Sequence, residues 1–291
     1  MTNAVKNRVS LIIVTHNSLP ALKDCLQSLR RAVKGQDFEL FLVDNRSDDR
    51  PDLTVKEIFP SAQIIHNEEN IGFGAACNRG AFNASGEFLL FVNPDVQVDD
   101  GIIDRLREVL RDNPKIGMSA ARCRLADGSF HPTCRNFPTT KNIFLSRGSF
   151  LSQLLGRCRP GRDTSYTLPD FTDNTIVPAV AGTVMMIRTE LFRKLKGFDT
   201  RFFMFMEDTD LSLRVTQAGY INLFVPKAGA VHHWGRGSRT GKVKRKWYHH
   251  ISVWRYFKKH YPNPFSYALL PLLLAFNFLF VIVLPDRHRK G

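Results

Sequence analysis

The sequence lacks paired cysteines and has no long apolar run near its N-terminus. It contains five cysteines, Cys25, Cys77, Cys123, Cys134 and Cys158. Their odd number and the absence of any CxxC pair argue against a disulfide framework and favour free thiols in a reducing cytoplasm. The weak metal-like spacing of His131 and Cys134 has no second pair, so a zinc site is not expected. Residues 9–14 are too few for a signal peptide and are typical of a strand.

Acidic residues are almost absent from the last part of the chain. From Lys227 to Gly291, thirteen Lys and Arg stand against one acid, so this segment carries +12 of the formal net charge of +14. A nearly neutral body with a basic tail indicates a local anionic partner, not a globally basic nucleic-acid coat. We therefore expect an anionic membrane surface as a partner and no nucleic acid.

The basic tail also contains a long apolar segment. Residues 265–284 carry no charge and are numerous enough to span a bilayer. Basic residues flank the segment on both sides, so they predict no orientation. A span, a buried core helix, and an in-plane or re-entrant helix pair broken at Pro271 all fit this pattern.

Apolar strands alternate with amphipathic helices in the first 120 residues. Strands are predicted at 9–14, 38–43, 64–66, 88–92 and 116–121, and helices at 19–32 and 104–111. This order predicts an α/β fold with a mostly parallel, doubly wound sheet. Ligands of such sheets bind beyond the carboxyl ends of the strands, where three of these strands end in Asn or Asp.

The regular alternation stops at residues 122–173, which are rich in Arg, Gly, Ser, Pro and Thr. We expect an excursion of the chain over the ligand site there, which shapes a pocket for an acceptor molecule (an acceptor-side excursion) or acts as a lid. A strand at 177–187 and a helix at 208–218 are expected to follow. The predicted organisation is a catalytic domain over 1–245. A basic amphipathic helix and an apolar membrane-associated tail follow over 246–291.

Three carboxylates, Glu207, Asp208 and Asp210, crowd together directly after the apolar run 202–206. Carboxylates repel one another and are costly to dehydrate, so this pattern indicates a pocket edge that holds a metal or accepts a proton. The alternative is a well-capped helix start, because acidic residues suit the positive end of a helix dipole. Asp210 is expected to fix the helix or to pair with Arg214.

Polar or glycine-rich motifs follow several strands: Val14-Thr15-His16-Asn17, residues 43–48, residues 70–80, Asn93-Pro94-Asp95 and residues 231–238. Each is weak alone, since ordinary strand-to-helix capping uses the same residue types. In this order they resemble the family 2 glycosyltransferases, inverting enzymes with the GT-A nucleotide-sugar fold. Within that family the likeness is to bacterial rhamnosyltransferases of cell-surface polysaccharide assembly.

The resemblance implies a nucleoside-diphosphate sugar donor such as dTDP-L-rhamnose, and a lipid-linked saccharide acceptor. It places the protein at the cytoplasmic face of the plasma membrane, peripheral or anchored by its C-terminal part. The donor contacts that it implies are Thr15, Asn17, Asp44, Asn45, Asn70, Gly72, Asn78, Asn93 and Arg236.

The resemblance also implies a divalent cation, Mg²⁺ or Mn²⁺, that neutralises the leaving diphosphate. Asn93 departs from the acidic residue that is commoner there, so Asp95 is expected to supply most of the metal contact. Relatives have a histidine a few residues before a serine. Counting back from Ser238 favours His233 over His232, and both stay open.

Asp208 is the expected base that takes the proton of the acceptor hydroxyl during in-line attack, and Glu207 is expected to orient the acceptor. This hypothesis requires that Asp95 and Asp208 face one sugar-sized cleft.

Three other functions would explain parts of the sequence. A nucleotidyltransferase would have a Gly-rich loop after the first strand, and a non-catalytic nucleotide-sugar or lipid-binding protein would need no base. A nucleic-acid binder is suggested by charge alone.

Overall fold

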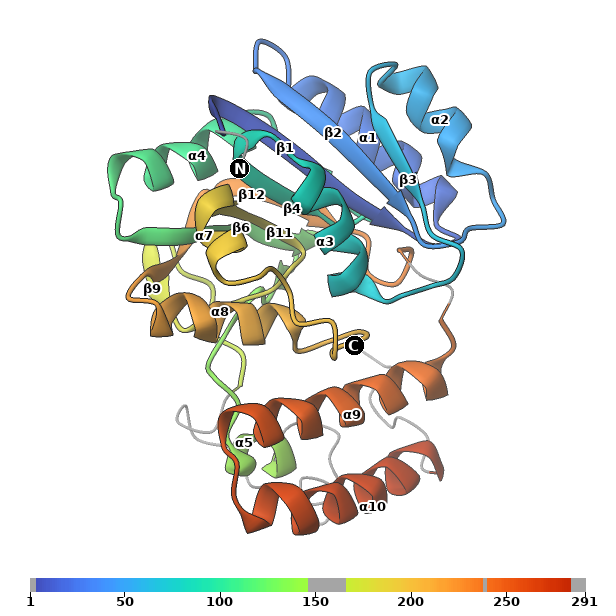
Figure 1. Cartoon of the computed structure of the whole chain (residues 1–291), viewed down its shortest axis with the longest axis vertical. Helices are drawn as coiled ribbons and strands as arrows, with labels where there is room; N and C mark the ends of the chain where they lie inside the picture. Colours follow the sequence, from blue (N-terminus) through green and yellow to red (C-terminus); the bar gives the residue numbers. More distant parts are fainter. Residues whose placement is uncertain (1–3, 146–165, 238–239, 284–291) are drawn as a thin grey trace.

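The computed structural model describes residues 4–145, 166–237 and 240–283. Figure 1 shows a body in which helices cover a central sheet, and beside this body a pair of long C-terminal helices. The predicted site residues all lie in the described ranges. Ser238 and residues 146–165 of the predicted excursion lie outside them.

The first half of the sheet is parallel, as predicted. Its strands are β1 (Val5–Thr15), β2 (Phe38–Asp44), β3 (Gln63–His66) and β4 (Gly86–Val92), in the order β3-β2-β1-β4. They alternate with helices α1 (Leu19–Ala32), α2 (Pro51–Ile58) and α3 (Phe73–Asn83). Parallel neighbours need such crossover connections, because the chain must return to the same end of the sheet before it begins the next strand.

The second half of the sheet mixes directions. Strand β11 (Val184–Arg188) runs antiparallel between β4 and β6 (Ile116–Leu125). Strand β12 (Ile221–His232) is parallel to β6, and the edge strand β5 (Val96–Val98) is antiparallel to β12. The predicted strand at 177–187 is therefore three short ones, β9 (Thr175–Val177), β10 (Ala179–Val180) and β11.

The remaining elements before α9 are α4 (Ile102–Asp112), β7 (Phe130–His131), β8 (Cys134–Arg135), α5 (Thr140–Leu145), α7 (Thr189–Lys194) and α8 (Glu207–Gln217). Strand β8 pairs with β10 in a separate two-stranded sheet. The start of the predicted excursion therefore contributes ordered backbone.

Both faces of the sheet are buried, which explains the continuous apolar runs of its strands. Leu11 and Ile13 of β1 pack in a cluster with side chains of α1, α2 and α4. Ile12 and Val14 point to the opposite face and pack in a cluster with α3, α7 and α8. The fold is therefore the predicted doubly wound α/β fold, with helices on both faces of one sheet.

The C-terminal part forms helix α9 (Lys242–His260), a π-helical turn η2 (Phe265–Leu269) and helix α10 (Leu270–Val283). The predicted boundary at residue 245 falls inside α9. Pro271 lies in the first turn of α10 directly after η2 and does not separate two helices. The pair of helices is α9 and α10, which pack on each other. Residues 265–282 form a helix that is long and apolar enough to cross a membrane, by length and composition.

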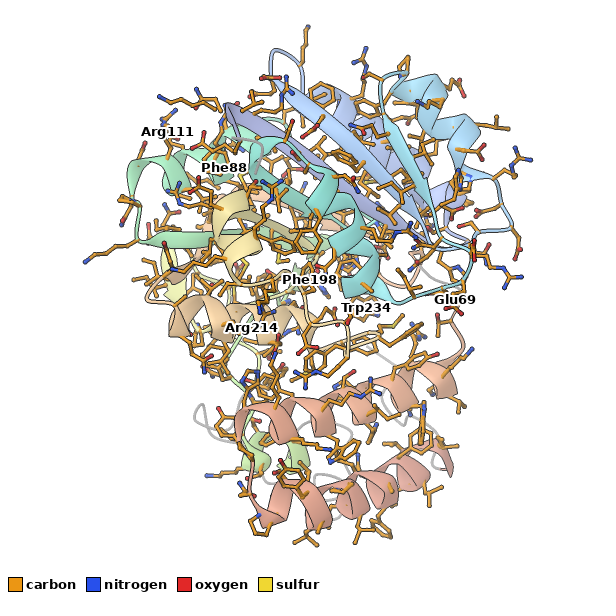
Figure 2. The ribbon with its side chains drawn as sticks, viewed as in Figure 1. Glu69, Phe88, Arg111, Phe198, Arg214 and Trp234 are labelled. Carbon is orange, nitrogen blue, oxygen red and sulfur yellow. The ribbon has the colours of Figure 1, made fainter. Side chains whose placement is uncertain are left out.

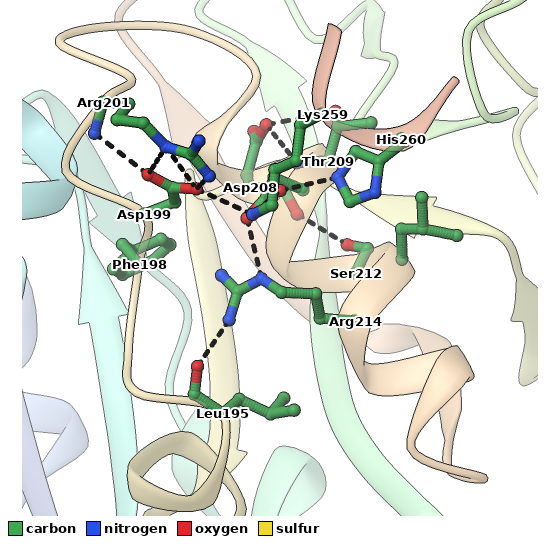
Figure 3. A network of polar contacts seen from close by, with 12 residues as sticks. Leu195, Phe198, Asp199, Arg201, Asp208, Thr209, Ser212, Arg214, Lys259 and His260 are labelled. Atoms are coloured by element: carbon green, nitrogen blue, oxygen red, sulfur yellow. Dashed lines mark hydrogen bonds and ion pairs between the residues drawn. The ribbon is translucent and has the colours of Figure 1, made fainter. Parts of the chain in front are cut away.

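A buried ionic network joins α8 to α9 (Figure 3). Asp210 is fully buried and accepts hydrogen bonds from Arg214 (2.8 Å), Lys259 (2.5 Å) and His260 (2.7 Å). Lys259 also binds Asp199 at 2.7 Å. The expected pair between Asp210 and Arg214 is confirmed. Because such a network is costly to open, it fixes α9 against the start of α8.

Candidate active site

A cavity of about 230 Å³ lies beyond the carboxyl ends of β1, β2, β4 and β12, where the sheet topology predicts a ligand site. Its floor includes the ends of those strands, and its walls include the start of α8 and Arg245 of α9. Eight predicted site residues line it: Thr15, Asn45, Asn70, Gly72, Asn93, Asp95, Glu207 and Asp208. Asp95 and Asp208 therefore face the same cavity.

Asp208 is held in place by contacts from three segments. Its Oδ2 accepts a hydrogen bond from the Gly182 N–H (2.9 Å) and lies 3.5 Å from Nη1 of Arg135. Its Oδ1 accepts a hydrogen bond from the Thr209 N–H (2.7 Å). Because these donors fix the plane of the carboxylate, the side chain keeps one orientation toward the cavity.

Glu207 is in a different electrostatic environment. Its side chain lines the cavity and is 6% exposed, and Oε2 has no hydrogen-bond partner among the described residues. Burial and the neighbouring Asp208 raise the pKa of Glu207 from 4.5 to about 8. Glu207 is therefore mostly protonated at neutral pH.

Asp95 contacts His232, not His233. Nε2 of His232 lies 3.2 Å from Oδ1 of Asp95, and both side chains are buried and line the cavity. His233 instead donates its backbone N–H to the Asp95 carbonyl, and among the described residues its side chain is not part of the cavity lining. The structure therefore places the side chain of His232, and not that of His233, beside Asp95, and the choice of metal ligand between them stays a prediction.

Asp95 and His232 suit a divalent cation. Neighbouring ligands of an octahedral ion, each about 2.1 Å from it, lie about 3 Å apart, close to the observed separation of 3.2 Å. Nδ1 of His232 is buried without a hydrogen-bond partner among the described residues. No group of three acidic, histidine or cysteine side chains gathers as a complete metal shell in the described ranges. Substrate oxygens or water would have to complete the shell.

A network of amides supports the other end of the cavity. Nδ2 of Asn45 donates to the Gly72 carbonyl (3.1 Å) and to Oδ1 of Asn70 (3.2 Å). Nδ2 of Asn67 donates to Oδ1 of Asn45 (2.6 Å). These bonds join the ends of β2 and β3 to the glycine-rich segment, and they leave Asn45 and Asn70 at the cavity wall.

Gly72 has a φ of +87°, and a Cβ atom at this position would lie 2.4 Å from the Phe203 carbonyl oxygen. The Phe73 N–H donates to the same carbonyl at 2.9 Å. Two segments of backbone therefore approach each other closely at Gly72. The partner is the loop that precedes α8, so Gly72 helps to place Glu207 and Asp208.

Four predicted donor contacts, Asn17, Asp44, Asn78 and Arg236, are not among the described residues that line the cavity. The side-chain amide of Asn78 pairs with both backbone groups of Phe198 (2.8 Å each) and so ties α3 to that loop. Asn17 accepts the Asp48 N–H, and Asp44 accepts the Ser47 N–H. Arg236 is exposed. In this structure the first three shape the surrounding loops.

The cavity also contains residues that were not among the predicted site residues. Arg135 lies beside Asp208, Arg245 comes from α9, and Trp234 packs its ring 5.2 Å from that of His232. In Figure 2, Trp234 lies at the edge of the catalytic body that faces α9. Arg135 stands in an irregular segment with no periodic signal. By contrast, alternation could have selected His232, because the buried positions Ala228 and Ala230 precede it at intervals of two.

Comparison with known proteins gives a consistent result. The profile described as Glycosyl transferase family 2 matches residues 10–196, and that of Glycosyl transferase family group 2 matches residues 140–285. An N-acetylglucosaminyl-diphospho-decaprenol L-rhamnosyltransferase of Mycobacterium tuberculosis is 29% identical over 258 residues, which are 84% of this chain and 82% of that protein. The rhamnosyltransferase WbbL of Escherichia coli is 25% identical over 86% of this chain and 93% of its own length.

Among solved structures, that of GalNAc-T7 with UDP, GalNAc and Mn²⁺ superposes with a TM-score of 0.60 at 17% sequence identity. The match covers 94% of this chain and 56% of that longer chain. At this identity the likeness shows the GT-A fold alone.

Proposed function

The chain belongs to the family 2 glycosyltransferases, and on that basis we propose that it is an inverting enzyme that transfers L-rhamnose from dTDP-rhamnose. The acceptor would be a hydroxyl of a lipid-linked saccharide in cell-surface polysaccharide assembly. The names of both curated relatives support the sugar, and the name of the mycobacterial relative also supports the lipid-linked acceptor. The main structural support is that Asp95 and Asp208 line one cavity.

The donor would lie across the carboxyl ends of the strands. Thr15, Asn45 and Asn70 provide polar groups at the end where the nucleoside would bind. Asp95 and His232 would hold a divalent cation, which would supply positive charge beside the diphosphate. Asn93, next to them in the cavity, has an amide that can donate a hydrogen bond to the sugar or diphosphate.

Asp208 is proposed as the base. As the acceptor oxygen bonds to the anomeric carbon, Asp208 takes its proton, and the bond from that carbon to the diphosphate oxygen breaks with its electron pair. Attack opposite to the leaving group inverts the anomeric configuration. Arg135 and the Gly182 N–H keep the Asp208 carboxylate aimed at the cavity.

Glu207 is proposed as a positioning group for the acceptor. Because it is mostly protonated at neutral pH, it can donate a hydrogen bond to an acceptor oxygen and does not compete for the proton. An ionised carboxylate at position 207 would also repel the donor diphosphate. The protonated form of Glu207 therefore suits both substrates.

We propose that the protein works at the cytoplasmic face of the plasma membrane, where a polyprenyl-diphosphate acceptor would be embedded. The apolar segment 265–282 and the basic tail support this location. The catalytic domain would then comprise the residues before α9, and the C-terminal helices would form the membrane-associated part.

The test is a donor screen that measures release of nucleoside diphosphate, with and without Mg²⁺ or Mn²⁺. The acceptor is N-acetylglucosaminyl diphosphate on a short polyprenol, or membrane extract. We expect turnover with dTDP-rhamnose and an inverted linkage in the product. Turnover with another donor would refute the sugar assignment, and absence of turnover with every donor would refute the transferase proposal.

Asp208→Asn separates catalysis from binding. It should lower kcat by about 10²- to 10⁴-fold while dTDP binding is nearly retained, because an amide cannot take the proton. The control is Asp112→Asn at the end of α4, outside the cavity, which should behave like the wild type. Loss of dTDP binding in Asp208→Asn would assign Asp208 to the donor or the metal instead.

A further inference from the structure

Helix α10 exposes an apolar stripe along its length. Only 17% of residues 265–282 are buried, although the segment contains no charged residue. Exposed apolar side chains stand at helical spacing from the last residue of η2 along α10: Leu269, Leu272, Phe276 and Leu279. Such a stripe is unusual on a surface that meets water, and it marks an interaction site.

Contacts along α10 hold it antiparallel to α9. The Lys246 Nζ donates to the Val281 carbonyl (2.7 Å), His250 bonds to Asn277 (2.9 Å), and the Trp254 Nε1 donates to the Ser266 carbonyl (3.0 Å). Because these contacts recur through both helices, α10 cannot tilt independently of α9. Figure 1 shows the two helices stacked, with α10 on the side of α9 away from the sheet.

Helix α9 is in turn fixed to the catalytic body. Ser252 donates to the Met204 carbonyl at 2.9 Å, and Arg255 donates to the Arg201 carbonyl. Lys259 and His260 enter the buried network around Asp210. The orientation of α10 relative to the catalytic body is therefore set by contacts through α9.

This arrangement is incompatible with α10 crossing a bilayer. If α10 stood along the membrane normal, α9 would stand beside it and place Arg255 within the hydrocarbon. The part of the catalytic body bound to Ser252 and Arg255 would enter as well. A cation at the centre of a bilayer is costly, and exposed backbone loops are not tolerated there.

We propose that α10 lies in the plane of the membrane, with its apolar stripe buried in one leaflet of an anionic bilayer. Residues suited to the lipid interface flank the stripe at both ends. Trp247 is half exposed beside Phe278, while Lys258 packs its ammonium over the rings of Trp254 and Tyr267. Aromatic rings and long basic side chains prefer this boundary.

The basic residues of α9 complete the surface. Lys242 and Lys244 are exposed in its first turn, and Arg245 of the same turn lines the catalytic cavity. These cations would attract anionic headgroups close to the cavity mouth. The inference deepens the proposed membrane location, and its test needs no transferase activity.

The first experiment measures flotation of the full chain with vesicles of phosphatidylethanolamine and phosphatidylglycerol. The double variant Leu272→Glu/Leu279→Glu should bind at least about tenfold more weakly, because two apolar anchors are replaced by charges. The matched control is Leu53→Glu on α2, since Leu53 is 66% exposed and Leu272 is 68% exposed. Equal melting temperatures would show that all variants fold.

Flotation of the double variant equal to that of the wild type would overturn the proposal, as would a wild type that does not float. Raised salt should weaken binding but not abolish it, because the stripe is apolar. Turnover of a water-soluble acceptor should be the same in wild type and double variant. A failure of the transferase proposal would therefore not be mistaken for a failure of this one.

The second experiment separates in-plane docking from a span. An epitope tag follows Gly291, and protease is added outside sealed vesicles that carry the protein on their outer surface. In-plane docking leaves both chain ends on one side, so the tag should be removed completely. A tag that stays protected until detergent is added would show that the segment crosses the bilayer and would overturn the proposal.

Discussion

His232 lies with its Nε2 3.2 Å from Oδ1 of Asp95, at the point where β12 ends beside the turn that follows β4. The contact joins two segments more than 130 residues apart in the sequence. Because both side chains are buried at the cavity wall, their separation is set by the sheet rather than by a mobile loop.

His232→Ala should weaken Mn²⁺ binding by at least about tenfold, since loss of an outer-shell partner alone costs 10- to 100-fold in other metal sites. The measurement is a Mn²⁺ titration followed by electron paramagnetic resonance with dTDP present. His233→Ala is the matched control and should bind Mn²⁺ like the wild type. A larger effect of His233→Ala would return the ligand role to that residue.

Glu207→Gln should stabilise the protein, and the gain should grow with pH. In the folded state the pKa of Glu207 is about 8 rather than 4.5. Between these two pH values the folded protein therefore keeps a proton that the unfolded chain releases. The wild type therefore loses stability as the pH rises from 4.5 to 8, on the order of 3 kcal/mol by pH 7, and the amide avoids this loss.

Melting temperatures at pH 5 and pH 8 measure this difference. Glu190→Gln, an exposed position in the first turn of α7, is the control and should show no comparable pH trend. A gain for Glu207→Gln that is equal at both pH values, or no gain, would show that Glu207 is ionised in the folded state.

Arg135→Gln should lower kcat, because Nη1 of Arg135 lies 3.5 Å from Oδ2 of Asp208 and helps to hold that carboxylate toward the cavity. Arg135→Lys keeps the charge and should retain more of the turnover. The measurement is kcat for both variants, with dTDP binding and melting temperature as further readouts. Equal losses of turnover that follow equal losses of melting temperature would indicate that Arg135 serves only to maintain the fold.

Gly72→Ala should destabilise the protein more than Gly35→Ala. Both glycines have positive φ, +87° and +77°, so both substitutions carry a backbone penalty, and the ψ of 170° at Gly72 is a conformation that only glycine adopts readily. Only at Gly72 does the added carbon meet the Phe203 carbonyl, and this clash should add about 1–3 kcal/mol. Urea unfolding measures the difference, and equal losses would mean that the loop before α8 moves aside freely.

The sequence predicts those parts of the fold that depend on local periodicity. Helix α1 occupies the predicted residues 19–32, and the predicted strands lie within β1, β2, β3, β4 and β6. The insertion of β11 antiparallel between β4 and β6 was not predicted, because strand order depends on contacts between distant segments. The same limit explains why a single strand was expected at 177–187.

The site follows a similar division. Asn93, Asp95 and the carboxylates of α8 were found because strand ends and acidic helix starts leave a local pattern. Asn78 has the residue type of a ligand contact but satisfies the backbone of Phe198 instead. Arg135 was missed because it reaches Asp208 only through the pairing of β8 with β10. Residue types that suit a ligand site can be recognised in short segments of the sequence. The direction in which each side chain points depends on contacts between distant segments.

Arg245 lines the catalytic cavity from one side of α9, and α10 packs on α9. If α10 rests among lipid headgroups, the reacting atoms stand only about one helix diameter, roughly 10 Å, above them. A hydroxyl on the first sugars of a membrane-bound carrier comes within that height, while the tip of a long glycan would overshoot it. The fixed height of the active site above the membrane therefore suits transfer to a short glycan, at an early step of its growth.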